Sequence, residues 1–137
     1  MTLLDTNTLI HYLKGREPVV TRLKAASPRE LAISSVVAYE VEYGSLKFGS
    51  SRRRTVVSAL LAGLAQIPFD REAAREAARI RFDLETRGLV IGPLDLLIAG
   101  TAVSRGAVLV TNNTQEFSRV KDLRLADWTK QKIPQIQ

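Results

Sequence analysis

Short apolar runs that end in polar residues constrain the fold of this chain most strongly. Three clear runs cover residues 2–4, 31–33 and 107–110, and each is too short to form a helix. A polar cluster follows each run at once: Asp5-Thr6-Asn7, Ser34-Ser35 and Thr111-Asn112-Asn113-Thr114. Because such residues favour helix caps and turns, each run is interpreted as a buried strand that ends at a polar turn.

Helical patterns fill the intervals between these strands. We expect helices from Asp5 to Gly15, over Val19–Ala26, over Val36–Phe48, from Ser50 to Leu64, from Asp70 to Gly88 and over Pro93–Arg105. Two weaker strands are expected at residues 67–69 and 123–125, and Pro68 marks the first of them as a strand end or an edge strand. Short apolar strands that alternate with helices favour parallel pairing. We therefore expect one α/β domain over residues 1–137, with a parallel sheet covered on both faces.

The composition excludes several kinds of chemistry. The chain has no Cys and a single His, so disulfides, Cys-based zinc sites, thiol nucleophiles and any mechanism with a pair of histidines are ruled out. Lys and Arg number 20 against 14 Asp and Glu, which gives a net charge of +6. This balance favours a polyanionic partner, although a basic solvated surface would give the same number. The start of the chain resembles no secretory signal and no apolar run is long enough for a membrane span, so we expect a cytoplasmic location.

Three carboxylates from distant parts of the sequence are expected near one edge of the sheet. Asp5 follows the first strand, Glu40 lies early in the helix 36–48, and Asp95 lies in the first turn of the helix that Pro93 opens. Ligands of open α/β sheets bind beyond the carboxyl ends of the strands. Clustered carboxylates repel one another unless a cation or proton compensates, and Mg²⁺ accepts such ligands. Each residue alone also has a structural explanation: a helix cap for Asp5, the helix dipole for Asp95, and solvent exposure for Glu40.

Four motifs occur in the same order as in a known family. They are Leu3-Leu4-Asp5-Thr6-Asn7, Ile33-Ser34-Ser35-Val36-Val37-Ala38-Tyr39-Glu40 with Tyr43-Gly44, Gly92-Pro93-Leu94-Asp95, and Val110-Thr111-Asn112-Asn113-Thr114-Gln115-Glu116-Phe117. With these motifs the sequence resembles the PIN-domain ribonucleases, and specifically the VapC toxins of type II toxin–antitoxin pairs. The resemblance implies a three-layer α/β/α sandwich with a parallel central sheet. It also implies endoribonuclease activity that depends on Mg²⁺ or Mn²⁺.

The resemblance also assigns roles to individual residues. Asp5, Glu40 and Asp95 match the acidic residues of the family, and Asp5 and Asp95 would hold the metal. A fourth acidic residue is common in the family where this chain has Asn113, and Glu116 stands three residues later. Either Glu116 takes that role or Asn113 binds through its carbonyl or a water. The expected hydrogen-bonding residues around the acids are Thr6, Asn7, Ser34, Thr111 and Asn113.

The chemistry and the partners follow from these assignments. Because no Cys and no pair of histidines is present, water activated by the metal is the expected nucleophile, which predicts 5′-phosphate and 3′-hydroxyl ends. The resemblance implies an RNA substrate such as transfer RNA, a homodimer, and a VapB-like antitoxin that covers the acidic edge. Tyr12, Val19 and Leu23 are candidates for the antitoxin groove, or ordinary core residues. The arginines at residues 52–54 and at Arg71, Arg75 and Arg79 contact RNA or form a solvated face.

Two other classes of protein remain as alternatives. A non-catalytic basic RNA-binding domain needs the arginine clusters and no metal site. A phosphoacceptor receiver domain needs paired acids after the first strand and a Lys after a late strand. It ranks last, because residues 108–119 contain no Lys.

Overall fold

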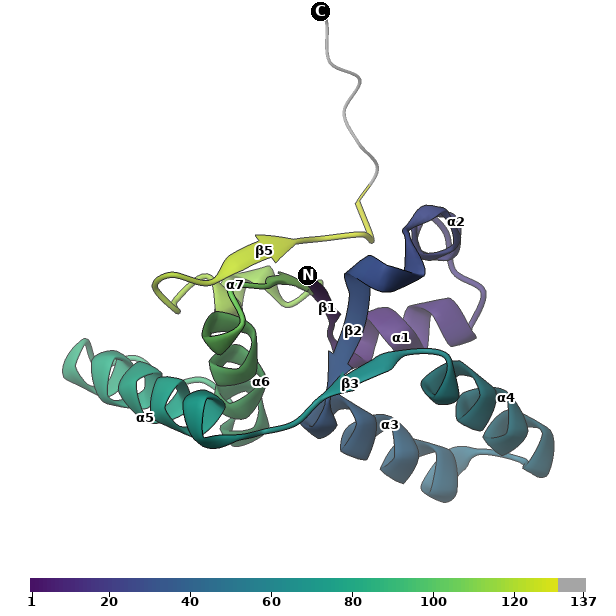
Figure 1. Ribbon diagram of the computed structural model, residues 1–137, viewed down its shortest axis with the longest axis horizontal. Coiled ribbons are helices and arrows are strands. Elements are labelled where there is room, and N and C mark those ends of the chain that lie inside the picture. The colour runs from purple at the N-terminus through teal and green to yellow at the C-terminus, as the bar shows by residue number, and fades with distance from the viewer. Residues whose placement is uncertain (131–137) are drawn as a thin grey trace, which may run out of the picture.

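A five-stranded parallel sheet lies at the centre of the computed structural model, which describes residues 1–130 (Figure 1). The strand order is β3-β2-β1-β4-β5, and every neighbouring pair is parallel. The strands are β1 (Thr2–Leu4), β2 (Leu31–Ser34), β3 (Ala65–Ile67), β4 (Val108–Val110) and β5 (Arg124–Ala126). The expected parallel α/β architecture is confirmed, whereas residues 131–137 of the predicted domain lie outside the described residues.

Seven α-helices accompany these strands within residues 1–130. They are α1 (Thr6–Leu13), α2 (Val19–Ala25), α3 (Ser35–Phe48), α4 (Ser51–Ala62), α5 (Arg71–Thr86), α6 (Pro93–Ser104) and α7 (Thr114–Phe117), with a 3-10 turn η1 at Pro28–Glu30. Four polar residues at the starts of helices cap them, because each side chain accepts a hydrogen bond from a backbone N–H of the first turn. These caps are Asp5, Ser34, Ser50 and Asp70.

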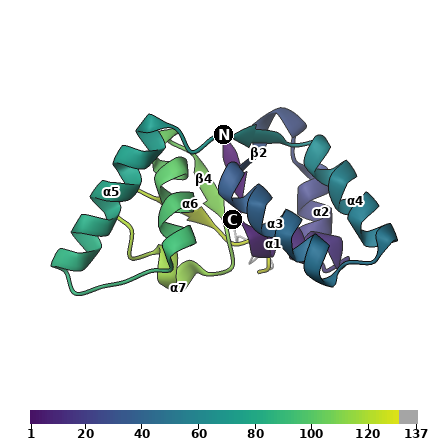
Figure 2. The same cartoon turned by 90° about the horizontal axis from the view of Figure 1, so that it is seen from below.

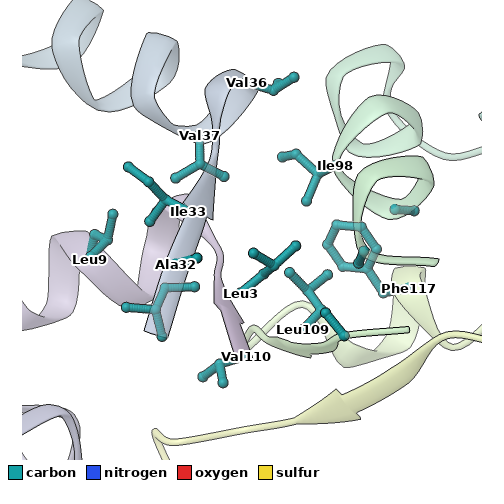
Figure 3. Close-up of a cluster of buried hydrophobic side chains, with 14 of the residues drawn as sticks. Leu3, Leu9, Ala32, Ile33, Val36, Val37, Ile98, Leu109, Val110 and Phe117 are labelled. Atoms are coloured by element: carbon teal, nitrogen blue, oxygen red, sulfur yellow. The ribbon is translucent and has the colours of Figure 1, made fainter. Parts of the chain in front are cut away.

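The helices cover both faces of the sheet. The chain passes from β1 through β2 to β3 with α1–α4 in the connections, then returns across the sheet to β4 through α5 and α6. Since parallel crossovers are right-handed, reversing the direction moves the later helices to the opposite face. Figure 2 shows α5 and α6 gathered away from α1–α4. Leu9 of α1 lies on one side of the strands, and Ile98 of α6 and Phe117 of α7 lie on the other (Figure 3).

Some sequence expectations change in detail. The strand expected at residues 67–69 lies at Ala65–Ile67, because Pro68 has no N–H with which to continue the ladder, and it is an edge strand as Pro68 indicated. The short helix α7 was not expected, since one helical turn has too few apolar positions to show periodicity. Among residues 1–130, no helix combines the length and apolar character of a membrane span.

Gly100 sits where α5 and α6 pack most closely. A Cβ at this position would lie 2.7 Å from the Cβ of Ala77 and 2.8 Å from the carbonyl oxygen of Ala73. We expect Gly100→Ala to destabilise the protein by about 1–3 kcal/mol, because α5 must move. Gly44 in α3 is the matched position, because nothing lies within 4 Å of a Cβ built there. Gly44→Ala should therefore raise the free energy of unfolding by about 0.5–1 kcal/mol. Urea unfolding measures both, and a gain in stability for both variants would contradict this view of the helix contact.

Candidate active site

The polar ends of the strands meet at the point where the strand order reverses. The chain leaves β1 toward β2, whereas β4 lies on the other side of β1, and such a switch point is where open α/β sheets bind ligands. Asp5 follows β1 directly, and its backbone N–H donates to the carbonyl of Val110 at 2.9 Å. Thr111 follows β4 and is fully buried. The register of β1 and β4 therefore places these two side chains next to each other.

Asp5 is a buried and firmly held carboxylate. The residue is 4% exposed, its Oδ1 accepts from the Thr6 backbone N–H at 2.9 Å, and its Oδ2 accepts from Thr111 Oγ1 at 2.7 Å. Burial raises the pKa of Asp5, the hydrogen bonds from Thr111 and Thr6 oppose this, and the charges of Glu40 and Glu116 add to it. Keeping a charge here is costly without a nearby cation.

Glu40 joins the same site from α3. Its Oε1 accepts a hydrogen bond from Thr6 Oγ1 at 2.8 Å, so Thr6 holds Asp5 with its backbone and Glu40 with its side chain. The charge of Glu40 raises the pKa of both Asp5 and Asp95. Glu40 is half-buried and faces the other acids, so the solvent-facing explanation for this residue is wrong.

Asp95 of α6 and Glu116 of α7 complete the acidic network. Glu116 Oε1 accepts from the backbone N–H of Gly92 at 2.7 Å, and Oε2 accepts from Asn113 Nδ2 at 2.6 Å. These two donors, with Gly92 the stronger, lower the pKa of Glu116. Burial first, and then the charges of Glu116, Asp5 and Glu40, raise the pKa of Asp95 to about 7. Asp95 therefore keeps its proton to a higher pH than Glu116 does.

The structure brings most of the sequence-predicted residues together. Thr6, Thr111 and Asn113 each donate a hydrogen bond to one of the acids. Ser34 is buried and caps α3 by accepting from the Val37 N–H at 3.1 Å, and within residues 1–130 it makes no hydrogen bond to an acid. Asn7 is exposed on α1, and its side chain makes no hydrogen bond within residues 1–130.

Sequence reasoning missed Gly92 as a part of the site. Its N–H holds Glu116, and a Cβ at this position would lie 3.1 Å from Asp95 Oδ2, so a glycine leaves room for both acids. The sequence offered one signal, because Gly92 stands just before Pro93 and Asp95. It offered no indication that Glu116, 24 residues away, would accept from that N–H.

The acids suit a hydrated hard cation better than a closed protein cage. In the described part of the chain, no three His, Asp or Glu side chains form a ready set of metal ligands. Burial first, and neighbouring carboxylates second, raise the pKa values of Asp5 and Asp95, so acidic groups gather here in a partly buried place. Mg²⁺ typically binds one or two protein carboxylates and keeps several waters, so the oxygen donors present fit such an ion.

The raised pKa of Asp95 predicts how the stability of the metal-free protein depends on pH. A carboxyl group whose folded pKa is raised from 3.8 to about 7 favours the folded state below that range and loses this advantage as the pH rises through it. In chelator, the free energy of unfolding should therefore fall by about 2 kcal/mol between about pH 5 and about pH 8, allowing for partial exposure of Asp95. Urea unfolding at both pH values checks this. Asp95→Asn should flatten the profile, and an unchanged profile in that variant would refute the assignment.

Comparisons with known proteins bear on this site. The PIN domain family model matches residues 2–123. The chain is 36% identical to the tRNA(fMet)-specific endonuclease VapC of Salmonella typhimurium over 92% of this chain and 96% of that protein. It is 37% identical to the protein of the same name from Shigella flexneri, over 93% and 97% of the two chains.

Solved structures give the same picture. A chain of the DNA-bound VapBC complex from Salmonella typhimurium is similar with a TM-score of 0.86 and 37% identity, covering 93% of this chain and 97% of that chain. A chain of VapBC2 from Rickettsia felis, bound to a DNA fragment from its promoter, gives a TM-score of 0.84 and 33% identity over 93% and 98%. The three-layer arrangement is therefore shared with toxin–antitoxin proteins.

Proposed function

Because the chain belongs to the PIN domain family, we propose that it is the toxin of a type II toxin–antitoxin pair and cleaves RNA as a metal-dependent endoribonuclease. The observation that carries this proposal is the network of four acids at one edge of the sheet. Its members are Asp5, Glu40, Asp95 and Glu116. The names of the relatives as endonucleases and ribonucleases support it.

Mg²⁺ is the cofactor that we propose, and Mn²⁺ should substitute for it. Asp5 and Asp95 would hold the ion, because they are the acids whose pKa values are raised by burial and by neighbouring negative charge. When bound, such an ion supplies a water of lowered pKa and offsets negative charge on the phosphate. Thr111 and Thr6 keep both oxygens of Asp5 in place for this role.

Glu40 and Glu116 are the two acids that remain, and we assign them to orienting the water and to completing the acidic site. Thr6 Oγ1 donates to Oε1 of Glu40, which leaves Oε2 available to orient the attacking water and to accept its proton. Gly92 and Asn113 each donate a hydrogen bond to Glu116, and these two bonds fix its carboxylate beside Asp95. Of the two explanations left open for the fourth position, we therefore favour Glu116 as the acid and Asn113 as the residue that positions it.

Transfer RNA is the substrate class that we propose. The Salmonella and Shigella relatives are named for tRNA(fMet), which makes an initiator transfer RNA the first substrate to test. The net charge of +6 suits a polyanion, and we place the reaction in the cytoplasm. Two of the candidate arginines already have structural partners: Arg53 donates to the Leu13 carbonyl, and Arg79 pairs with Glu76. Arg52, Arg54, Arg71 and Arg75 remain candidates for phosphate contacts.

An RNA cleavage assay with the purified chain separates this function from its alternative. The nuclease proposal expects defined fragments from a labelled initiator transfer RNA in the presence of Mg²⁺. A non-catalytic basic RNA-binding domain expects a shift in electrophoretic mobility without fragments. Binding without cleavage in Mg²⁺ and in Mn²⁺ would therefore favour the alternative.

A groove between α1, α3 and α4 is the site that we propose for a segment of a VapB-like antitoxin. It has a volume of about 340 Å³, and Glu40 of the acidic network is one of its lining residues. Its apolar lining is Ile10, Leu13, Val41, Phe48 and Val57. The structural neighbours from VapBC complexes support a partner of this kind.

The three residues first considered for an antitoxin groove do not line this one. Val19 is completely buried and belongs to the core, so its assignment to a binding surface is wrong. Tyr12 and Leu23 are half-buried and lie outside the lining. An apolar residue on a short helix has the same sequence pattern whether its face meets the core or a partner.

Gly44→Leu tests the groove directly. Nothing lies within 4 Å of a Cβ at Gly44, so the new side chain can project into the groove without disturbing α3. We expect the affinity for the cognate antitoxin to fall by at least about tenfold, because the groove is then occupied. Titration calorimetry measures this, with Glu42→Leu at an exposed position of the same helix as the control. Equal affinities for the two variants would place the antitoxin elsewhere.

The predicted homodimer has one supporting observation. Phe82 on α5 and Val90 after it are 71% and 73% exposed. They lie beside two hollows on the α5–α6 side of the molecule, of about 250 and 550 Å³. Large exposed apolar side chains that adjoin hollows are typical of protein interfaces. We therefore propose this side as the dimer surface.

A further inference from the structure

A hollow adjoins the acidic network and shares no lining residue with the antitoxin groove. It has a volume of about 480 Å³ and is lined by the loop Val90–Pro93 and by four side chains that follow β4: Asn113, Gln115, Glu116 and Arg119. Glu116 and Gly92 belong to both the hollow and the acidic network. A substrate strand that places one phosphate at the acids would therefore extend into this hollow with its neighbouring nucleotide.

Arg119 supplies the positive charge in this hollow. It stands one turn after Glu116, and its backbone N–H donates to the Glu116 carbonyl at 3.2 Å. Its guanidinium lowers the pKa of Glu116, so the two groups are close in space. Within residues 1–130, however, Arg119 has no carboxylate within 4.0 Å. Within the described residues the positive charge of Arg119 is therefore not neutralised by an ion pair.

The guanidinium is also held in position before any ligand binds. Arg119 Nη1 donates to the carbonyl of Val90 at 2.8 Å, and the Arg119 carbonyl accepts from Arg87 Nη2. An arginine has five N–H donors in a planar fork, so most of them remain for another acceptor. A fixed arginine loses little conformational freedom on binding and matches the geometry of a phosphate.

We propose that Arg119 binds the phosphate next to the one that is cleaved and that this hollow is a nucleotide subsite. The inference rests on the proposed ribonuclease function and adds a specificity contact to it. Four acids alone would repel an RNA strand, and a cation one step along the strand offsets that repulsion. Gln115 is exposed at the hollow, and its side-chain amide makes no hydrogen bond within the described residues. It therefore offers a place where charge can be added without removing a contact.

Arg119→Gln is the first test. The probe is a fluorescein-labelled initiator transfer RNA, and binding is measured in an Asp5→Asn background so that it is not consumed. We expect the dissociation constant to rise about tenfold and the slope of its logarithm against log salt to fall by about one, as for a lost phosphate contact. In the otherwise wild-type chain, KM should rise more than kcat falls, and Arg119→Lys should recover much of the affinity.

Arg29→Gln is the matched control, because it removes the same charge from an exposed residue directly before β2, at the amino end of this strand, whereas the acids lie beyond the carboxyl ends. Equal dissociation constants and salt slopes for Arg119→Gln and Arg29→Gln would overturn the inference. Arg119 would then have only a structural role, as the residue whose side chain hydrogen-bonds to the carbonyl of Val90. If Arg119→Gln fails to fold, Gln115→Lys and Gln115→Glu decide. The Lys variant should bind the probe more tightly than wild type and the Glu variant more weakly, and equal binding would overturn the subsite.

The same assays separate the subsite from the proposed function. If the wild-type chain binds the transfer RNA through Arg119 but cuts no RNA in Mg²⁺ or Mn²⁺, the ribonuclease function fails and the phosphate contact stands. If the chain cuts RNA and Arg119→Gln cuts with an unchanged KM, the function stands and the subsite fails.

Discussion

Asp5→Asn should abolish RNA cleavage, with a loss of at least about a hundredfold. Asp5 is the most deeply buried of the four acids, and Thr6 and Thr111 hold its two carboxylate oxygens. An Asn side chain has nearly the same shape and can still accept from one of these donors, but it carries no negative charge for a cation. Gel analysis of a labelled transfer RNA measures the loss.

The same variant should be at least as stable as wild type in the absence of metal. Burial and the nearby acids raise the pKa of Asp5, so ionisation of this group costs folding free energy at pH values above its unfolded pKa of 3.8. Removing the charge removes that cost, and the melting temperature in chelator at neutral pH should not fall. Glu42→Gln, which removes a charge from an exposed position on α3, is the control and should cleave RNA normally. Loss of cleavage caused only by unfolding of Asp5→Asn would contradict this account.

Removal of divalent metal should lower the rate of RNA cleavage by at least about a hundredfold, because water without a metal ion is a poor nucleophile toward a phosphodiester. The chain has no Cys and one His, so its own residues offer few other nucleophiles. Added Mg²⁺ or Mn²⁺ should restore activity after EDTA. Each ion should also raise the melting temperature of wild type, because a ligand stabilises only the form that binds it. The rise should be much smaller for Asp5→Asn.

EDTA that has been saturated with Mg²⁺ before addition controls for direct effects of the chelator. Full cleavage in EDTA alone would show that the acids act without an ion. A melting temperature that rises equally with Mg²⁺ in wild type and in Asp5→Asn would place the ion at another site.

Local features of the fold could be predicted from the sequence because they depend on neighbouring residues. Asp5, Ser34, Ser50 and Asp70 cap helices through atoms within three residues of themselves. The alternation of short apolar strands and helices indicates a parallel sheet for a similar reason, since both faces must be covered. The order of the strands was not predicted, because it depends on where each crossover leads.

Contacts of the site that join distant segments were only partly predictable. Asp5 after a strand, Glu40 in the second turn of a helix and Asp95 in a first helical turn were brought to one edge in the prediction. The bond from Gly92 to Glu116 depends on the path of the loop before α6, and no local pattern encodes that path. The residues of the antitoxin groove were also not predictable, since Val19 has the apolar helical pattern of a binding face but packs into the core.

The chemical nature of the ends that cleavage leaves tests the central claim most directly. Wild type and Asp5→Asn are incubated with total RNA in Mg²⁺ or EDTA, and the new ends are mapped and assayed for phosphate. Attack by water, without the RNA 2′-hydroxyl, predicts new 5′-phosphate and 3′-hydroxyl ends with wild type in Mg²⁺, and no new ends in EDTA or with Asp5→Asn. New 2′,3′-cyclic phosphate ends, or cleavage at the same positions by Asp5→Asn in EDTA, would contradict it.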